Sequence, residues 1–297
     1  MEKFSEKFRD AIREVLSLST QPSHITGADI YQEADERIRD IIDTKITENL
    51  LLEDSTLSGA QYLNELCKKS AEGSACLILC EHYSNMDLPI VSYLMRKAGA
   101  KDCAKQLLAI AGMKLNEDEP ALAAFSGGFT RIIICPSHQS ESLDPERHKD
   151  ERLRLIGINR SAMKKLDEVK HQGKIILLFP SGTRYRPWDP HTRNVRREVD
   201  SYIKSFDYMC FCSINGIVLH INQGKMVEDT TSKDLLHITV SPIYNCADFR
   251  KKIRDSIVGN ETIDKKQAVA DKIRDTLLAL HNEAEPERLK KLQGYSK

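Results

Sequence analysis

The chain has 297 residues, with 44 basic and 44 acidic residues and a formal net charge of zero. This length suits one large α/β domain with a smaller appendage, or two modest domains. The balance of charge gives no sign of a nucleic acid or an anionic bilayer as a partner. No run approaches the roughly 20 apolar residues that cross a bilayer, and the N-terminus lacks a signal-peptide pattern. We therefore expect a cytoplasmic protein that binds no nucleic acid and contacts the inner membrane surface only peripherally, if at all.

The eight cysteines include no paired C-x-x-C of the zinc-binding kind. Cys76 and Cys80 are an even number of residues apart in an apolar run, as are Cys210 and Cys212. On a strand, each pair would face one side. We interpret these residues as buried, reduced thiols that pack as small hydrophobes.

Residues 1–72 are predicted to form a helical module. Apolar residues recur with a helical period over Phe4–Leu18, Ala28–Leu52 and Ser58–Ser70, and a break is expected near Pro22. These residues contain no pair of histidines or carboxylates at a catalytic spacing. We interpret the module as a scaffold or a cap.

Over residues 73–297, strand-like apolar runs alternate with helical segments. Strands are expected at Ala75–Cys80, Lys105–Ala111, Phe129–Cys135, Lys174–Phe179, Tyr208–Ile214, Ile217–Ile221 and Leu236–Pro242. Helices are expected at Pro89–Ala98, Pro120–Phe125, Glu151–His171, Arg196–Phe206 and Ala268–Glu285. This alternation predicts an α/β domain with a mostly parallel mixed sheet that helices cover on both faces. In such sheets, sites form at the carboxyl ends of the strands.

The first candidate site follows the strand expected at Ala75–Cys80. In the stretch Glu81-His82-Tyr83-Ser84-Asn85-Met86-Asp87, the side chains of His82 and Asp87 can approach each other. A carboxylate on one imidazole nitrogen fixes the tautomer and leaves the other nitrogen as a base, which contributes ~10²–10⁴-fold to a rate. Alternatively, Asp87 caps the next helix and His82 packs beneath it. Taken alone, the spacing favours this second interpretation.

The second candidate site follows the strand expected at Lys174–Phe179. Residues 180–187, which we call the arginine loop, carry Arg184 and Arg186 between two prolines. An i, i+2 pair in an extended loop points both guanidiniums to one side, and two planar forks suit a phosphate dianion. A solvated basic loop with weak surface ion pairs is an equally weighted alternative.

Two side chains are candidate nucleophiles for a covalent mechanism. Ser181 stands at a strand-to-turn junction, but the G-x-S-x-G frame of a nucleophile elbow is missing. Cys80 would share a strand face with His82, but it lies inside the apolar run, which favours core packing. A covalent mechanism is therefore the less favoured prediction.

Together, the two motifs resemble those of the glycerolipid acyltransferase family, whose first motif is H-x-x-x-x-D and whose third is F-P-x-G-T-R. Here they are His82 with Asp87, and Phe179-Pro180-Ser181-Gly182-Thr183-Arg184. The family's second region is similar to Ala111-Gly112-Met113-Lys114-Leu115, Pro120 and Gly127-Gly128-Phe129-Thr130-Arg131, and its fourth block to Val240-Ser241-Pro242. The resemblance covers about residues 73–245, with the motifs in order.

Within the family, P-S-G-x-R-x-R-P is most similar to the soluble, plastid-type glycerol-3-phosphate acyltransferases. The resemblance implies that His82 deprotonates the acceptor hydroxyl, that Asp87 orients His82, and that Arg184 and Arg186 hold the phosphate. It also implies a substrate contact for Arg131.

The chain departs from the family pattern at three places. The soluble branch has Lys-His where this chain reads Cys135-Pro136-Ser137-His138. The resemblance implies that His138 keeps the substrate-binding role without the lysine, and His148-Lys149 is the less favoured substitute. Gly128-Phe129-Thr130-Arg131 is shorter than the family's usual second motif. Many relatives have glutamate at the position of Ser181, although the soluble branch has serine. Backbone N–H groups near Ser181 and Gly182, or at the start of the Pro89 helix, are candidate donors to an oxyanion.

The expected activity is transfer of a fatty acyl group from a thioester of coenzyme A or acyl carrier protein to glycerol-3-phosphate, giving lysophosphatidate for phospholipid biosynthesis. No metal and no cofactor other than the acyl donor is expected. Three alternatives stay open: lysophosphatidate as the acceptor, a serine hydrolase that uses Ser181, and a non-catalytic module that binds an acyl carrier protein.

Overall fold

The computed structural model of the chain describes residues 1–296 except positions 23, 118, 137–143, 145–146, 225–227, 259–261 and 263. His138, one of the predicted substrate contacts, lies outside the described residues. The described strands are β1 (Glu2–Lys3), β2 (Tyr31–Gln32), β3 (Thr56–Ser58), β4 (Cys76–Cys80), β5 (Leu107–Gly112), β6 (Arg131–Ile134), β7 (Ile175–Leu178), β8 (Tyr208–Asn215), β9 (Leu219–His220), β10 (Thr230–Thr231), β11 (His237–Val240) and β12 (Tyr244–Asn245).

Most strands join one mixed sheet in the order β2-β6-β5-β7-β4-β8-β11-β3, with β12 beside β8. Five neighbours, from β6 through β5, β7 and β4 to β8, run parallel. The pairs β2–β6 and β8–β11 are antiparallel. The predicted fold class is therefore confirmed, and β4 and β7, which precede the two candidate motifs, are direct neighbours at the centre of the sheet.

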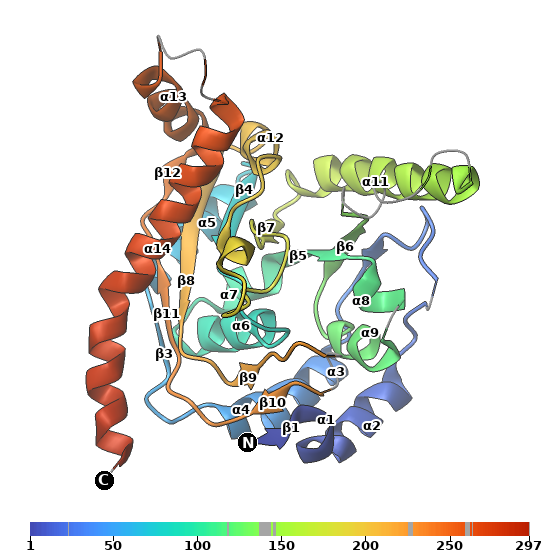
Figure 1. Cartoon of the computed structure of the whole chain (residues 1–297), viewed down its shortest axis with the longest axis vertical. Coiled ribbons are helices and arrows are strands. Elements are labelled where there is room, and N and C mark those ends of the chain that lie inside the picture. Colours follow the sequence, from blue (N-terminus) through green and yellow to red (C-terminus); the bar gives the residue numbers. More distant parts are fainter. Residues whose placement is uncertain are drawn as a thin grey trace.

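The described helices are α1 (Phe4–Lys7), α2 (Arg9–Leu18), α3 (Glu36–Ile41), α4 (Glu48–Leu50), α5 (Ala60–Ala71), α6 (Asp87–Lys97), α7 (Lys101–Gln106), α8 (Lys114–Glu117), α9 (Pro120–Ser126), α11 (Lys149–Val169), α12 (Val199–Lys204), α13 (Cys246–Ser256) and α14 (Lys265–Leu292). A π-helical stretch, Ile42–Thr47, joins α3 to α4, and a 3-10 turn covers Pro190–Arg193. Figure 1 shows the N-terminal helices α1 to α4 gathered at one end of the molecule and α14 running along one side.

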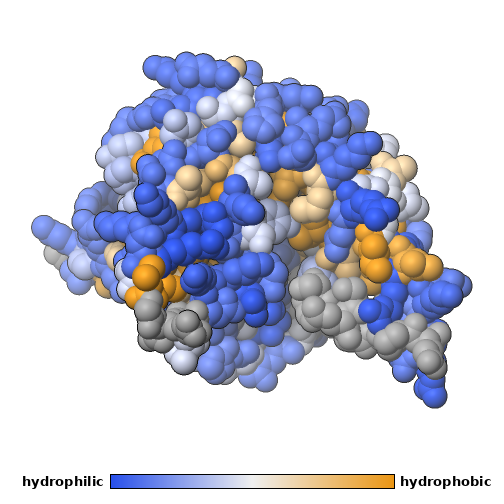
Figure 2. Space-filling view, turned by 90° about the horizontal axis from the view of Figure 1, so that it is seen from above, coloured by the Kyte–Doolittle hydropathy of each residue, from blue (hydrophilic) through white to orange (hydrophobic). Residues whose placement is uncertain are grey.

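The sheet is buried on both faces because side chains along β4 alternate between two hydrophobic clusters. Cys76, Ile78 and Cys80 pack with residues of α2, α3 and α6, whereas Leu77 and Leu79 pack with residues of α11, α12 and α14. Cys76 and Cys80 share one face, as predicted, and so do Cys210 and Cys212. The eight cysteines are free thiols, and all except the half-buried Cys67 are buried. Figure 2 shows that the surface seen from above is mostly hydrophilic, with only small hydrophobic patches.

The N-terminal helices belong to the same hydrophobic core as the sheet. Phe8, which joins α1 to α2, and Val15 of α2 belong to the cluster that contains Ile78 of β4. The first 72 residues also supply β2 and β3, which form the two edges of the large sheet. The boundary at residue 72 stays a prediction.

One helix predicted near the N-terminus begins later than expected. The range Ala28–Leu52 was expected to be helical, but Tyr31–Gln32 is a short strand and α3 starts at Glu36. The reason is tertiary pairing, since Tyr31 and Gln32 lie opposite Ile132 and Arg131 at the sheet edge. The strand expected at Ile217–Ile221 contains β9 (Leu219–His220), whereas α7, α13 and the strands β1 and β10 were not expected.

Candidate active site

His82 and Asp87 form a direct imidazole–carboxylate pair at the carboxyl end of β4. The Nδ1 of His82 is 2.8 Å from Oδ2 of Asp87, the first residue of α6. A carboxylate only accepts hydrogen bonds, so this contact assigns the hydrogen to Nδ1 and leaves Nε2 with a free lone pair. The side chain of His82 is 17% exposed and that of Asp87 is 4% exposed. Nε2 can therefore act as a base that is partly open to solvent.

The Asp87 carboxylate is fixed by the turn that precedes α6. Its Oδ2 accepts from the backbone N–H groups of Tyr83, at 2.6 Å, and Ser84, at 2.9 Å, and its Oδ1 accepts from the Ser84 hydroxyl at 2.9 Å. The helix has no side-chain cap bond at Met86, its N-cap residue. The interpretation of Asp87 as a helix cap is therefore wrong, because its bonds go to the turn and to His82.

The arginine loop lies directly against His82. The N–H of Tyr185 donates to the carbonyl oxygen of His82 at 2.7 Å. The ring of Phe179, which ends the β7 segment, stacks on the imidazole with 4.1 Å between ring centroids and 17° between ring planes. Because β4 and β7 are parallel neighbours, their carboxyl ends bring the two motifs together.

The two arginines of the predicted phosphate site differ in their surroundings. Arg184 Nη1 lies 2.7 Å from Oδ2 of Asp229, a carboxylate that is only 2% exposed. Arg186 is exposed, and its side chain forms no ion pair with any residue that the structure describes. Of the two guanidiniums, that of Arg186 is free to meet an anion, whereas that of Arg184 is already neutralised.

Ser181 and Gly182 are placed beside His82 but have partners of their own. The Ser181 hydroxyl donates to the carbonyl oxygen of Thr183 at 2.7 Å. The Gly182 N–H donates to the carbonyl oxygen of Phe179 at 3.0 Å, in a turn that requires a φ of +67° at Gly182. The Gly182 N–H is therefore already bonded, and in this arrangement it cannot donate to an oxyanion.

The structure does not bring Arg131 to His82. The two strands β5 and β7 separate β6, which begins at Arg131, from β4. The guanidinium of Arg131 is buried, and it donates to the carbonyl oxygen of Ser126 and, at 3.1 Å, to Oε1 of Gln21. Desolvation lowers the pKa of Arg131 to about 9, so the group is still charged at neutral pH. Its contacts are those of a structural arginine.

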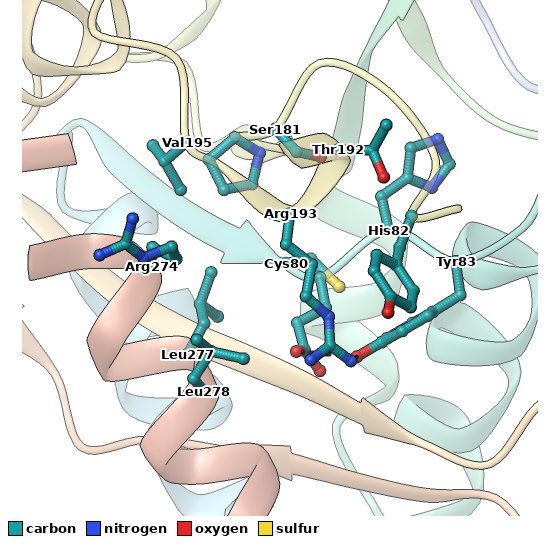
Figure 3. A pocket seen from close by; sticks show the side chains of 13 residues that line it. Cys80, His82, Tyr83, Ser181, Thr192, Arg193, Val195, Arg274, Leu277 and Leu278 are labelled. Carbon is teal, nitrogen blue, oxygen red and sulfur yellow. Dashed lines mark hydrogen bonds between the residues drawn. The ribbon is translucent and has the colours of Figure 1, made fainter. Parts of the chain in front are cut away.

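A cavity lies behind the candidate base, between the turn after β4, the arginine loop and α14. Its walls include His82, Ser181, Tyr185 and Arg193, together with Leu277 and Leu278 of α14. Neither Arg184 nor Arg186 lines it. Figure 3 shows that the imidazole of His82 and the guanidinium of Arg193 point away from each other.

Two residues near the site had no motif to identify them. Asp229 precedes β10 at a distance of 45 positions from Arg184, and neither its spacing nor its neighbours indicated an ion pair. Arg193 likewise belongs to no motif. The guanidinium of Arg193 in fact lies over the Tyr185 ring, 4.2 Å from its centroid.

The sequence profile of the family described as Acyltransferase matches residues 56–206, slightly more than half of the chain. The chain therefore belongs to the acyltransferase family. The match includes both candidate motifs. No curated protein matches the chain.

Two further observations concern metals and membranes. Within the described ranges, no three His, Cys, Asp or Glu side chains gather in a way that could hold a metal ion. Among the helices that the structure describes, none has the length and apolar content to cross a membrane.

Proposed function

We propose that this acyltransferase moves a fatty acyl group from a thioester of coenzyme A or acyl carrier protein to a hydroxyl of glycerol-3-phosphate, giving lysophosphatidate. The observation that carries this proposal is the pair formed by His82 Nδ1 and Asp87 Oδ2, which leaves Nε2 as a base on a residue whose backbone carbonyl binds the arginine loop. Membership of the acyltransferase family supports the reaction class, and the resemblance to soluble glycerol-3-phosphate acyltransferases supports the acceptor.

In the proposed mechanism, Nε2 of His82 takes the proton of the acceptor hydroxyl as its oxygen attacks the thioester carbonyl. The carbonyl becomes a tetrahedral oxyanion. When it collapses, the carbon–sulfur bond breaks, and the leaving thiolate takes the proton from the imidazolium. The buried carboxylate of Asp87 stabilises that imidazolium and keeps the ring in the correct orientation.

The positive charge for the acceptor phosphate comes from the arginine loop. We assign the first contact to Arg186, because its exposed guanidinium has no carboxylate partner within the described part of the chain. Arg184 joins only if the phosphate competes with Asp229 for its Nη1. That exchange would leave the buried carboxylate of Asp229 without its guanidinium partner, which is costly.

The alternative that uses Ser181 as a nucleophile has little support in the geometry. The Ser181 hydroxyl donates to a backbone carbonyl, and a nucleophilic serine instead needs a base that accepts its hydrogen. A fluorophosphonate probe that labels Ser181 would nevertheless favour the hydrolase.

Product analysis by mass spectrometry tests the proposal. The purified protein is incubated with glycerol-3-phosphate or lysophosphatidate, and each acceptor is combined with acyl-CoA and with acyl carrier protein thioester. We expect lysophosphatidate to form from glycerol-3-phosphate, His82→Ala to abolish its formation, and His171→Ala, which changes an exposed histidine, to have no effect.

Other outcomes would change the proposal in defined ways. Acylation of lysophosphatidate alone would replace the acceptor, and binding of acyl carrier protein without any turnover would favour the non-catalytic module. Near-normal product formation by His82→Ala would remove the base from the mechanism.

A further inference from the structure

A second imidazole–carboxylate pair lies behind His82 and is not used by the proposed mechanism. Glu81 directly precedes His82, and its side chain is only 8% exposed. Its Oε2 accepts from Nδ1 of His281 on α14 at 2.9 Å and from the N–H of Ile214 on β8 at 2.9 Å. Three segments remote in the chain therefore meet at the carboxylate next to the candidate base.

The same imidazole also contacts the residue on the other side of His82. Nδ1 of His281 is 3.3 Å from the hydroxyl of Tyr83, and that hydroxyl donates to Oε1 of Glu81 at 3.0 Å. Burial, followed by the charge of Glu81, raises the pKa of Tyr83, so the phenol keeps its hydrogen at neutral pH. Both sequence neighbours of His82 are thus held by His281.

The backbone of His281 is itself held in place by β8. The side-chain amide of Asn215 donates to the backbone carbonyl of His281 at 2.9 Å and to Oε2 of Glu285 at 2.7 Å. Because the Glu81 carboxylate can only accept, the hydrogen of the His281 ring is assigned to Nδ1. The geometry therefore fixes both the position of this ring and its tautomer.

The network continues into the arginine loop through Arg193. Nη2 of Arg193 donates to the Tyr83 hydroxyl at 3.1 Å, and the guanidinium stacks on the ring of Tyr185. Tyr185 in turn donates its N–H to the carbonyl oxygen of His82. Figure 3 shows Arg193 beside Tyr83 at the wall of the cavity. The side chains on either side of His82 and its own carbonyl oxygen therefore belong to one network.

We propose that His281 and Glu81 are positioning residues that hold the backbone of His82 so that its imidazole meets the acceptor hydroxyl. The proposal rests on the acyl transfer proposed above. Hydrogen bonds inside a protein reinforce one another, and a misplacement of about 1 Å at a reacting group can cost ~10²-fold in rate. Among the described residues, the side-chain contacts of Glu81 and His281 are with Tyr83, Ile214 and each other, and none is with the imidazole of His82.

Steady-state acyl transfer by His281→Ala and His281→Asn tests the proposal. We expect His281→Ala to lower kcat by about 10–100-fold with little change in the KM of the acceptor, since the misplaced group is the base and not the anion site. Asparagine places an N–H donor near the position of Nδ1, so His281→Asn should recover most of kcat. His171→Ala is the matched control, because Nδ1 of His171 also contacts an oxygen atom, the carbonyl oxygen of Gly73, but at an exposed position.

A measurement that needs no activity keeps this inference separate from the proposed function. Long-range proton–nitrogen NMR spectra at fixed pH report the two ring nitrogens of His82 without substrate. In the wild type and in His281→Asn, we expect the two nitrogen shifts of His82 to be well separated, as in a ring that carries its hydrogen on Nδ1. In His281→Ala, we expect these two shifts to move toward their average. If the wild type transfers no acyl group, the proposed function fails, and the spectra still decide whether His281 positions His82.

A second variant keeps the inference testable if His281→Ala does not fold. Tyr83→Phe removes only the hydroxyl that joins Glu81 to Arg193, so the fold should survive, while kcat falls and the His82 shifts move in the same direction. The inference is overturned if His281→Ala and Tyr83→Phe fold normally and leave both kcat and the His82 shifts at their wild-type values.

Discussion

The backbone N–H of Tyr185 donates to the carbonyl oxygen of His82 at 2.7 Å, and this bond joins two motifs that are remote in the chain. It places the arginine loop against the candidate base through main-chain atoms, which do not depend on the identity of the side chains. The side chains of the loop have different contacts. Tyr185 lines the cavity with Arg193, whereas Arg184 pairs with Asp229.

Replacing Asp87 with asparagine should inactivate the enzyme without unfolding it. Asp87→Asn is expected to lower kcat by ~10²–10⁴-fold, because an amide no longer fixes the Nδ1–H tautomer or stabilises the imidazolium. Steady-state kinetics and urea unfolding check this, with the exposed Asp40→Asn as the control. Near-normal kcat in a folded Asp87→Asn protein would show that the carboxylate serves only the turn.

The two arginines of the loop should respond differently to removal. Arg184→Ala leaves the buried carboxylate of Asp229 without its guanidinium, so the free energy of unfolding should fall by about 1–3 kcal/mol. Arg186→Ala changes an exposed side chain, so it should leave stability unchanged and raise the KM of the acceptor. Urea titration and acceptor kinetics on both variants make the comparison. Equal losses of stability, or an unchanged KM in Arg186→Ala, would contradict this division.

Arg131 was expected to contact substrate, and its surroundings predict a different result for its removal. Arg131→Met takes away the donors to Gln21 and the Ser126 carbonyl, so the free energy of unfolding should change by roughly 1–3 kcal/mol. Two strands separate β6 from β4, so kcat and the KM of the acceptor should stay near their wild-type values. A raised acceptor KM in a protein of normal stability would return Arg131 to the substrate site.

The stability of the fold should depend on pH through His237 on β11. Burial lowers the pKa of His237, and its ring nitrogens lie 3.2 Å from the hydroxyls of Thr56 and Ser58. The unfolded chain titrates near the ordinary value of 6.5. As the pH falls below that value, the unfolded state takes up a proton that the folded state does not, and protonation therefore favours unfolding.

The measurement compares urea unfolding at about pH 7.5 and about pH 5.5. Wild-type stability should be lower at the lower pH, and His237→Gln, which cannot titrate, should lose less of it. Part of the dependence should persist in the variant, because burial also lowers the pKa of His220. An identical loss in wild type and variant would exclude His237 as the titrating group.

The sequence by itself determined the fold class and the central strands, and the two motifs taken together indicated the pairing of His82 with Asp87. Apolar runs such as Ile175–Leu178 are buried on both faces, so their composition alone predicts central strands of a parallel sheet. His82 and Asp87 are five residues apart across one strand-to-helix turn, so local geometry is enough to bring them within hydrogen-bonding distance.

Only the tertiary structure decided which charges meet. Asp229 neutralises Arg184, and His281 reaches Glu81 from a helix 200 positions further along the chain, with no motif for either contact. The short strand Tyr31–Gln32 likewise replaced a predicted helix because it pairs with β6. The physical reason is range: periodicity and turn chemistry act over a few residues, whereas the partner of a buried charge or of an edge strand depends on how distant segments pack.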